Sequence, residues 1–289
     1  EPLDALFVSL PTYLAPEVTM AGLERGLHVF CEKPPGRTVS DIRAVIAVER
    51  RHPQLKLKYG FNHRYHDSIR EALRIHRSGE LGELVNMRGL YGKSKIISYA
   101  GGKSPSAWRA QRRYAGGGIL LDQGIHMIDI MRLFAGDFVE VKSFVSNGYW
   151  GHDVEDNAFA LLKDAKGRIA MLHSTATQWA HRFSLEVTFQ EGFLLLRGIL
   201  SGSKSYGQER LIIGRRDESV AGSAREETIT YLEDNSWREE IGEFAEALIH
   251  GRRIRSGTSA DALAAMETVY RIYNADTAWR DAHGIEPVG

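Results

Sequence analysis

Short apolar runs alternate with amphipathic stretches at the start of the chain. Three apolar runs have the length of buried strands, at residues 5–10, 28–31 and 55–61. Two stretches between them have helical spacing, at residues 16–25 and 40–51. Gly26 is a typical helix stop, and Ser40, followed by Asp41, is expected to cap the second helix. Short links in the order strand, helix, strand, helix, strand predict parallel strands of a doubly wound, Rossmann-type sheet.

The patterning changes after residue 62. Helical spacing recurs at residues 67–78, 119–134, 237–250 and 259–281, and strand-like runs occupy residues 84–90, 139–145, 157–162, 169–177, 184–189, 193–197 and 210–213. Short turn segments between the later strands favour antiparallel pairing. Residues 93–115 are rich in Gly, Ser, Pro, Lys and Arg and are expected to form a long loop, which in a compact domain is usually functional.

The predicted fold therefore has two parts. A partial Rossmann domain (α/β) is expected over residues 1–62, and an α+β domain with a large, mainly antiparallel sheet over residues 63–289, with the boundary near residues 61–64. A parallel sheet needs both faces covered, so three parallel strands make a poor independent domain. The first part is thus expected to be the C-terminal half of a dinucleotide-binding domain.

Composition argues against several classes of partner. Lys+Arg and Asp+Glu number 37 each, so no net charge favours nucleic acid or an acidic membrane. No uncharged apolar run reaches the ~18 residues of a membrane helix, and the first residues do not resemble a signal peptide. Cys31 is the one cysteine and cannot form a disulfide within the chain. We expect a cytoplasmic protein that acts on a small molecule.

A carboxylate and an imidazole share one predicted helix face. Asp122 and His126 are four residues apart, with Asp129 one turn further on, and three glycines at residues 116–118 precede the helix. A carboxylate beside an imidazole fixes its tautomer and raises its pKa, which suits a general base acting on a hydroxyl. The alternatives are an ordinary surface or core Asp/His pair, or three ligands of a metal ion.

Lys33 follows the second predicted strand directly. In open α/β sheets ligands bind beyond the carboxyl ends of the strands, so this lysine is placed to donate to a substrate oxygen. The alternative is a surface lysine in a turn. In the long loop, Trp108 and Arg109 precede Arg112 and Arg113, which indicates either a lid over a polar ligand or a solvated basic loop.

A further group of side chains interrupts strand-like sequence late in the chain. Trp179, His181 and Arg182 stand between two predicted strands, and they could line a pocket.

Together these segments resemble the Gfo/Idh/MocA family, which includes glucose–fructose oxidoreductase and inositol dehydrogenase. The blocks that carry the resemblance are residues 26–34 (GLHVFCEKP), 60–65 (GFNHRY), 79–83 (GELGE) and 116–129 (GGGILLDQGIHMID). Their spacing is similar to that of the family, and the resemblance covers essentially the whole chain. It implies an oxidoreductase that uses NAD or NADP to transfer a hydride to or from a carbon of a sugar, sugar nucleotide or cyclitol.

The resemblance also implies roles for individual residues. It implies His126 as the acid/base, Lys33 as the stabiliser of the developing oxyanion, and Asp122 as the residue that orients the site. Residues implied to hold the cofactor are Leu10, Pro11, Thr12, Glu32, Lys33, Pro34, Trp108 and Arg109. Residues implied to bind the substrate are Arg64, Tyr91, Asp122, His126 and Trp179. No residue is expected to bind a metal.

The chain departs from the family pattern in two places. Ala15 stands where the family usually has a histidine after the first strand, beside the cofactor. The Gly-rich turn that cradles the pyrophosphate does not precede residue 5, so we expect either a fragment or a shortened natural form, with weak cofactor binding.

Two other functions stay open. One is a non-catalytic binding or assembly protein, and the other is a family hydrolase that uses NAD within an elimination mechanism. The segment 201–210 favours a sugar derivative as the substrate. The large sheet is expected to pack against a second copy, giving a homodimer or homotetramer.

Overall fold

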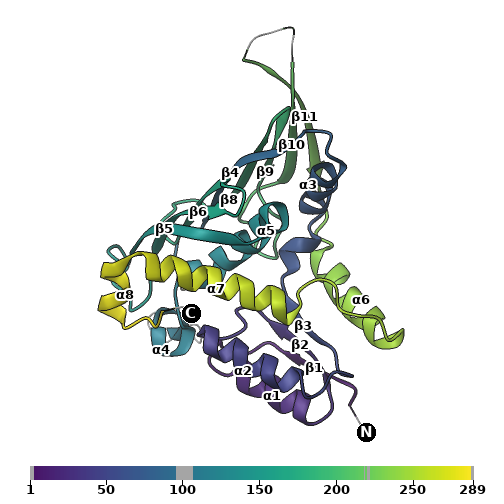
Figure 1. The fold of residues 1–289 in the computed structure, drawn as a ribbon, viewed down its shortest axis with the longest axis vertical. Coiled ribbons are helices and arrows are strands. Elements are labelled where there is room, and N and C mark those ends of the chain that lie inside the picture. Colours follow the sequence, from purple (N-terminus) through teal and green to yellow (C-terminus); the bar gives the residue numbers. More distant parts are fainter. Residues whose placement is uncertain (1–2, 96–106, 218, 220–221, 288–289) are drawn as a thin grey trace.

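The computed structural model describes residues 3–95, 107–217, 219 and 222–287. Its first part is a parallel sheet of three strands in the order β1-β2-β3, namely β1 (Ala5–Val8), β2 (His28–Glu32) and β3 (Leu57–Gly60). Helices α1 (Ala15–Glu24) and α2 (Val39–Glu49) connect the strands and lie together beside the sheet (Figure 1). The predicted parallel, Rossmann-like connectivity is confirmed.

The predicted start of α2 was wrong by two residues. Thr38, not Ser40, is the N-cap, and its hydroxyl accepts a hydrogen bond from the Asp41 backbone N–H at 3.1 Å. The Asp41 carboxylate accepts in return from the Thr38 N–H at 3.2 Å. This reciprocal capping box satisfies two donors at once, which a lone serine cap at residue 40 would not do.

The second part is built on an eight-stranded sheet in the order β11-β10-β9-β8-β4-β7-β6-β5. Its strands are β4 (Leu84–Gly92), β5 (Phe138–Ser146), β6 (Asn157–Asp164), β7 (Ile169–Thr175), β8 (Arg182–Phe189), β9 (Gly192–Arg197), β10 (Glu209–Arg216) and β11 (Ala224–Tyr231). The β4–β7 pair is parallel, and the other pairs are antiparallel. The predicted large, mainly antiparallel sheet is confirmed. The pattern missed β11, an edge strand with few buried side chains.

One face of the large sheet is covered by helices α5 (Ile125–Ala135) and α7 (Ser259–Ala275) (Figure 1). The contact with α5 is close: a Cβ on Gly89 of β4 would lie 2.4 Å from Cε of Met131. Further helices are α3 (Asp67–Ser78), α6 (Ser236–Ile249) and α8 (Thr277–His283). On the small sheet, Phe244 of α6 packs edge-on against Phe7 and Phe30.

Three predicted segments differ from the structure: two predicted helices are irregular, and the predicted loop includes short helical turns. The predicted helix 259–281 breaks at Asp276, whose carboxylate caps α8 by accepting from the Trp279 N–H at 3.0 Å. The predicted helix 119–134 starts with a π-helical turn, η3 (Leu120–Gly124). The predicted loop 93–115 contains a 3₁₀ turn and the short α4 (Arg112–Ala115), and its residues 96–106 lie outside the described residues.

Helix α7 and the turn before it connect the two sheets. The Tyr59 N–H in β3 donates to the carbonyl of Gly257 at 2.6 Å, and Gly257 has a φ of +68°, which favours glycine. The hydroxyl of Tyr270 in α7 donates to the carbonyl of Arg37. These bonds fix the carboxyl ends of the small sheet against the helices of the large one. Across the described ranges, no helix combines the length and apolar character that a membrane crossing requires.

Candidate active site

The site begins with the glycines at residues 116–118, which the Glu155 carboxylate anchors. Its two oxygens accept from the N–H groups of Gly118 at 2.7 Å and Leu120 at 3.0 Å, and Tyr273 of α7 donates to it at 2.7 Å. A Cβ on Gly118 would lie 2.1 Å from the carbonyl oxygen of Glu155. The turn therefore requires glycine at this position, and a buried carboxylate occupies the N–H groups that could otherwise bind a ligand.

After this turn the chain forms η3 and then α5, so Asp122 lies in the wider turn and His126 in the regular helix. π-Helical turns are rare and are frequent at functional sites. The two side chains were expected to be neighbours on one helical face. In the structure their partners differ: Asp122 bonds to lysines and Gln123, while the His126 ring lies against another histidine.

Two lysines share the Asp122 carboxylate. Lys33 Nζ lies 3.5 Å from Oδ1 and donates to the backbone carbonyl of Asp122 at 2.6 Å, while Lys93 Nζ lies 3.4 Å from Oδ2. Burial alone would raise the pKa of Asp122, but Lys93, Lys33 and Arg109 hold it well below its usual range. Burial lowers the pKa of Lys93, and Asp122 opposes that effect. The result is a fixed carboxylate flanked by two ammonium donors.

His126 is buried, with 3% of its surface exposed. Burial, with the charges of Lys33, Lys93 and His66, holds its pKa well below the usual value. The expectation that Asp122 raises this pKa was wrong, because the lysines neutralise Asp122 and the burial of the ring dominates. His126 is therefore neutral at pH 7 and can accept a proton.

A cleft of about 540 Å³ opens where β1 and β2 end. It is lined by Ser9, Leu10, Pro11, Thr12, Glu32, Lys33, Pro34, Trp108, Arg109, Asp122 and Trp237. The structure thus gathers all the residues predicted to hold the cofactor, from two strand ends and the segment before α4. It also brings Lys33 and Asp122 to the same cleft, whereas His126 is not among its lining residues.

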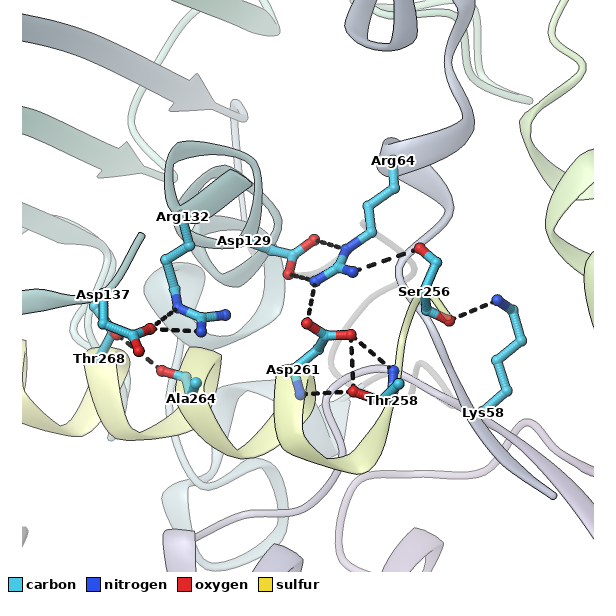
Figure 2. Close-up of polar contacts among 10 residues, drawn as sticks. All are labelled: Lys58, Arg64, Asp129, Arg132, Asp137, Ser256, Thr258, Asp261, Ala264 and Thr268. Atoms are coloured by element: carbon cyan, nitrogen blue, oxygen red, sulfur yellow. Dashed lines mark hydrogen bonds and ion pairs between the residues drawn. The ribbon is translucent and has the colours of Figure 1, made fainter. Parts of the chain in front are cut away.

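Arg64 forms ion pairs with two carboxylates, those of Asp129 and Asp261 (Figure 2). Its Nε and Nη2 donate to the two oxygens of Asp129 at 2.7 and 2.5 Å, and Nη2 also lies 3.1 Å from Asp261 of α7. Bidentate pairs of this kind are strong and fix orientation. Arg64, in the 3₁₀ helix η1 (Asn62–Tyr65), thus joins α5 and α7 and does not line the cleft, which does not support the predicted substrate contact.

The other predicted substrate residues occupy different environments. Tyr91 is buried and its hydroxyl lies 2.9 Å from Nε2 of His63. Trp179 is 91% exposed and does not line the cleft. His181 forms a hydrogen bond of 2.6 Å with the hydroxyl of Ser205, in the loop that follows β9.

Among the described residues, no three His, Cys, Asp or Glu side chains converge as metal ligands. The alternative of Asp122, His126 and Asp129 as ligands fails because lysines engage Asp122 and Arg64 engages both oxygens of Asp129.

Sequence reasoning missed two residues of the site, Lys93 and His63. Lys93 directly follows β4, but the pattern assigned it to the loop, although its backbone N–H bonds to Thr175 in β7 at 2.8 Å. His63 lies inside the block of residues 60–65, where it attracted no separate role. A polar residue at the end of a predicted strand is the signal that could have identified Lys93.

The chain matches two models of one family. The model described as the oxidoreductase family with an NAD-binding Rossmann fold matches residues 1–61. The model described as the GFO/IDH/MocA C-terminal domain matches residues 69–195. The two matches correspond to the small sheet and to much of the large one.

Curated relatives include two sugar oxidoreductases. A 1,5-anhydro-D-fructose reductase of Ensifer adhaerens is 28% identical over 206 residues, which are 69% of this chain and 58% of that protein. A levoglucosan dehydrogenase of Pseudarthrobacter phenanthrenivorans is 28% identical over 207 residues, which are 63% of this chain and 51% of that protein. The chain therefore spans between half and two thirds of the length of these relatives.

Solved structures share the fold. A levoglucosan dehydrogenase in complex with NADH superposes with a TM-score of 0.82 at 20% identity, over 96% of this chain and 78% of that one. An aldose–aldose oxidoreductase from Caulobacter crescentus gives a TM-score of 0.78 at 24% identity, over 95% of this chain and 77% of that one.

Proposed function

Because the chain belongs to the GFO/IDH/MocA family of oxidoreductases, we propose that it carries the substrate side of a sugar dehydrogenase or reductase. The observation that carries the proposal is the shared Asp122 carboxylate between Lys33 and Lys93, beside a cleft at the ends of β1 and β2. Ligands of open α/β sheets bind at this edge.

The residues of the cleft fit the nicotinamide end of NAD or NADP. Its volume lies within the usual range for cofactor sites, roughly 300–1,000 Å³. Leu10, Pro11 and the two tryptophans offer apolar surface for a flat ring, while Thr12 and Arg109 offer donors. When bound, the cofactor supplies the hydride chemistry, and the protein supplies position and charge.

The roles proposed for the catalytic residues follow from their charges. The Lys33 ammonium, held against the Asp122 carbonyl, stabilises negative charge on the reacting oxygen. His126, neutral at pH 7, accepts the hydroxyl proton in oxidation and returns it in reduction. Asp122 stays ionised and holds both lysines in place.

A sugar or sugar nucleotide is the proposed substrate class. Named relatives with this substrate type support it, among them the anhydrofructose reductase and a putative UDP-kanosamine synthase subunit of Amycolatopsis mediterranei, 29% identical over 253 residues.

The test combines cofactor binding with turnover. The chain would be titrated with NADH and NADPH by fluorescence, and then assayed at 340 nm with levoglucosan, myo-inositol, D-glucose and 1,5-anhydro-D-fructose. We expect cofactor binding, and turnover that the His126→Asn variant loses. Binding of neither cofactor, with no turnover of any substrate, would favour the non-catalytic assembly protein.

We also propose that the open face of the large sheet binds a second copy of the chain. Exposed apolar side chains lie on three adjacent strands, at Phe144 (80% exposed), Phe159, Leu161, Ile169 and Met171. Phe144 and Phe159 are cross-strand partners, so the exposed groups form one surface. A symmetric pair of such faces buries the same residues from each copy.

A further inference from the structure

The ring of His126 lies flat against the ring of His63. The ring centroids are 3.8 Å apart and the planes are 12° from parallel. Both side chains are buried, and Phe61 contacts His126 edge-on at 6.3 Å. A contact on the face of an imidazole leaves both of its nitrogens available in the plane of the ring.

Among the described residues, Nδ1 of His126 lacks the hydrogen bond that usually orients a catalytic histidine. Catalytic histidines are commonly oriented by a hydrogen bond from the second ring nitrogen to a carboxylate or carbonyl. Nδ1 of His126 is buried and has no hydrogen-bond partner among the described residues. The stack with His63 therefore supplies the flat surface against which the ring lies.

Both nitrogens of His63 are occupied. Nδ1 lies 3.0 Å from Oδ1 of Asn62, and Asn62 Nδ2 donates to Ser236, which directs Oδ1 towards the histidine. Nδ1 therefore carries the proton, and Nε2 accepts from the Tyr91 hydroxyl at 2.9 Å. His63 is a neutral ring in a fixed tautomer.

Charged groups around the pair oppose a positive charge on either ring. Lys33 and Lys93 approach from the cleft side, and burial with these charges lowers the pKa of both histidines. Behind His63, the His66 ring lies 5.4 Å away and bonds to the Glu209 carboxylate at 2.8 Å.

We propose that His63 is a positioning residue that holds the plane of His126 by stacking and presents it with a neutral aromatic face. The inference rests on the proposed function, in which His126 exchanges the substrate proton. The His63 face accommodates the transient imidazolium as an aromatic face accommodates a cation, without competing for its proton. A protonated partner at the same place would repel it.

The experiment compares His63→Ala, which removes the ring, with His63→Phe, which keeps a flat neutral ring. His76→Ala is the matched control, because His76 is a half-buried histidine that, like His63, packs against other rings, those of Phe134 and Phe189. Two readouts are taken: kcat and KM with the substrate found above, and the titration of His126 by NMR of its ring nitrogens, assigned with His126→Asn.

We expect His63→Ala to lower kcat about 100-fold with KM changed less than about threefold, the size of loss that a small misplacement of a catalytic group produces. His63→Phe is expected to restore kcat to within about fivefold of wild type, since a flat ring again supports His126. By NMR, the pKa of His126 should rise in His63→Ala, because the vacated space admits water to the ring, but stay below its ordinary value because Lys33 and Lys93 remain. In His63→Phe it should stay as low as in the wild type, since a ring again covers His126.

Two results would overturn the proposal. One is a kcat in His63→Ala equal to that of His76→Ala, and the other is an equal loss in His63→Phe and His63→Ala. If the wild-type protein turns over no substrate, the proposed function fails, while the NMR titration still decides whether His63 controls His126.

Discussion

Lys33 and Asp122 are 89 residues apart in sequence and meet through two groups, the Lys33 ammonium lying 2.6 Å from the Asp122 carbonyl oxygen and 3.5 Å from its carboxylate. The carbonyl bond ties the lysine to the π-helical turn whatever the charge of the carboxylate. Lys33 follows β2 of the small sheet, but its ammonium is held by a backbone carbonyl of the part built on the large sheet. This relation connects the small sheet directly to the π-helical turn before α5.

Removing Lys33 is expected to affect turnover more than removing Lys93. Lys33→Met should lower kcat by about 100-fold or more, because one charged donor at a developing oxyanion has that worth. Lys93→Met should lower kcat by roughly tenfold, since Lys33 remains in place. Steady-state kinetics of the two variants at pH 7 would check this, and equal losses would contradict the assigned roles.

Arg64→Met is expected to destabilise the fold. It leaves the Asp129 carboxylate buried without its bidentate partner, which costs about 3–5 kcal/mol in comparable buried pairs. The double variant Arg64→Met/Asp129→Leu removes both charges and should recover most of that loss. Urea unfolding monitored by circular dichroism measures both, and a double variant no more stable than the single one would refute the explanation.

The free energy of unfolding is expected to decrease as the pH is lowered below about 6.5, the pKa of a histidine in the unfolded chain. The pKa values of His63 and His126 are lowered in the fold, so the unfolded chain binds protons that the folded chain excludes. Their contribution is present above about pH 6.5 and is lost as the pH falls, by up to about 1.4 kcal/mol per pH unit for each group. Urea midpoints between pH 7.5 and 5.5 would show the slope.

The matched variant for this prediction is His126→Asn, which removes one of the two groups. Its unfolding free energy should depend less steeply on pH than that of wild type. An unchanged slope would mean that His126 is accessible to protons in the folded state.

Self-association through the large sheet is expected to depend on Phe144. Phe144→Glu should shift the protein to monomer in light scattering after size-exclusion chromatography, because a charge placed within an apolar interface is desolvated there. Leu232→Glu is the control, since Leu232 is also 80% exposed and lies outside these strands. A monomeric wild type, or equal effects of both substitutions, would contradict the interface.

The sequence predicts best the features that depend on local order. The strand end that carries Lys33 could be placed because it directly follows a run of apolar residues, and the glycines before Asp122 because they directly precede one. The cleft residues come from distant segments, from Ser9 to Trp237, and here the family resemblance supplied what local patterning could not.

Contacts between residues far apart in the sequence could not be predicted. The ion pair of Lys93 with Asp122 could not be predicted, because it depends on how the end of β4 lies against the π-helical turn. The stack of His63 on His126 likewise joins residues that are 63 positions apart. The pKa of His126 was predicted in the wrong direction because spacing on a helix indicates neighbours but not burial. Arg64 was assigned to the substrate because its partners, which lie 65 and 197 positions away, could not be identified from the sequence.

The π-helical turn before α5 makes the site sensitive to chain length. Such a turn holds one residue more than an α-helical turn, so deleting one residue between positions 120 and 124 would rotate the following side chains by about 100° relative to Asp122. His126 would then leave the His63 ring and Asp129 would leave Arg64. A homologue with one residue fewer between positions 120 and 124 could keep Asp122, His126 and Asp129 and still lack their present arrangement.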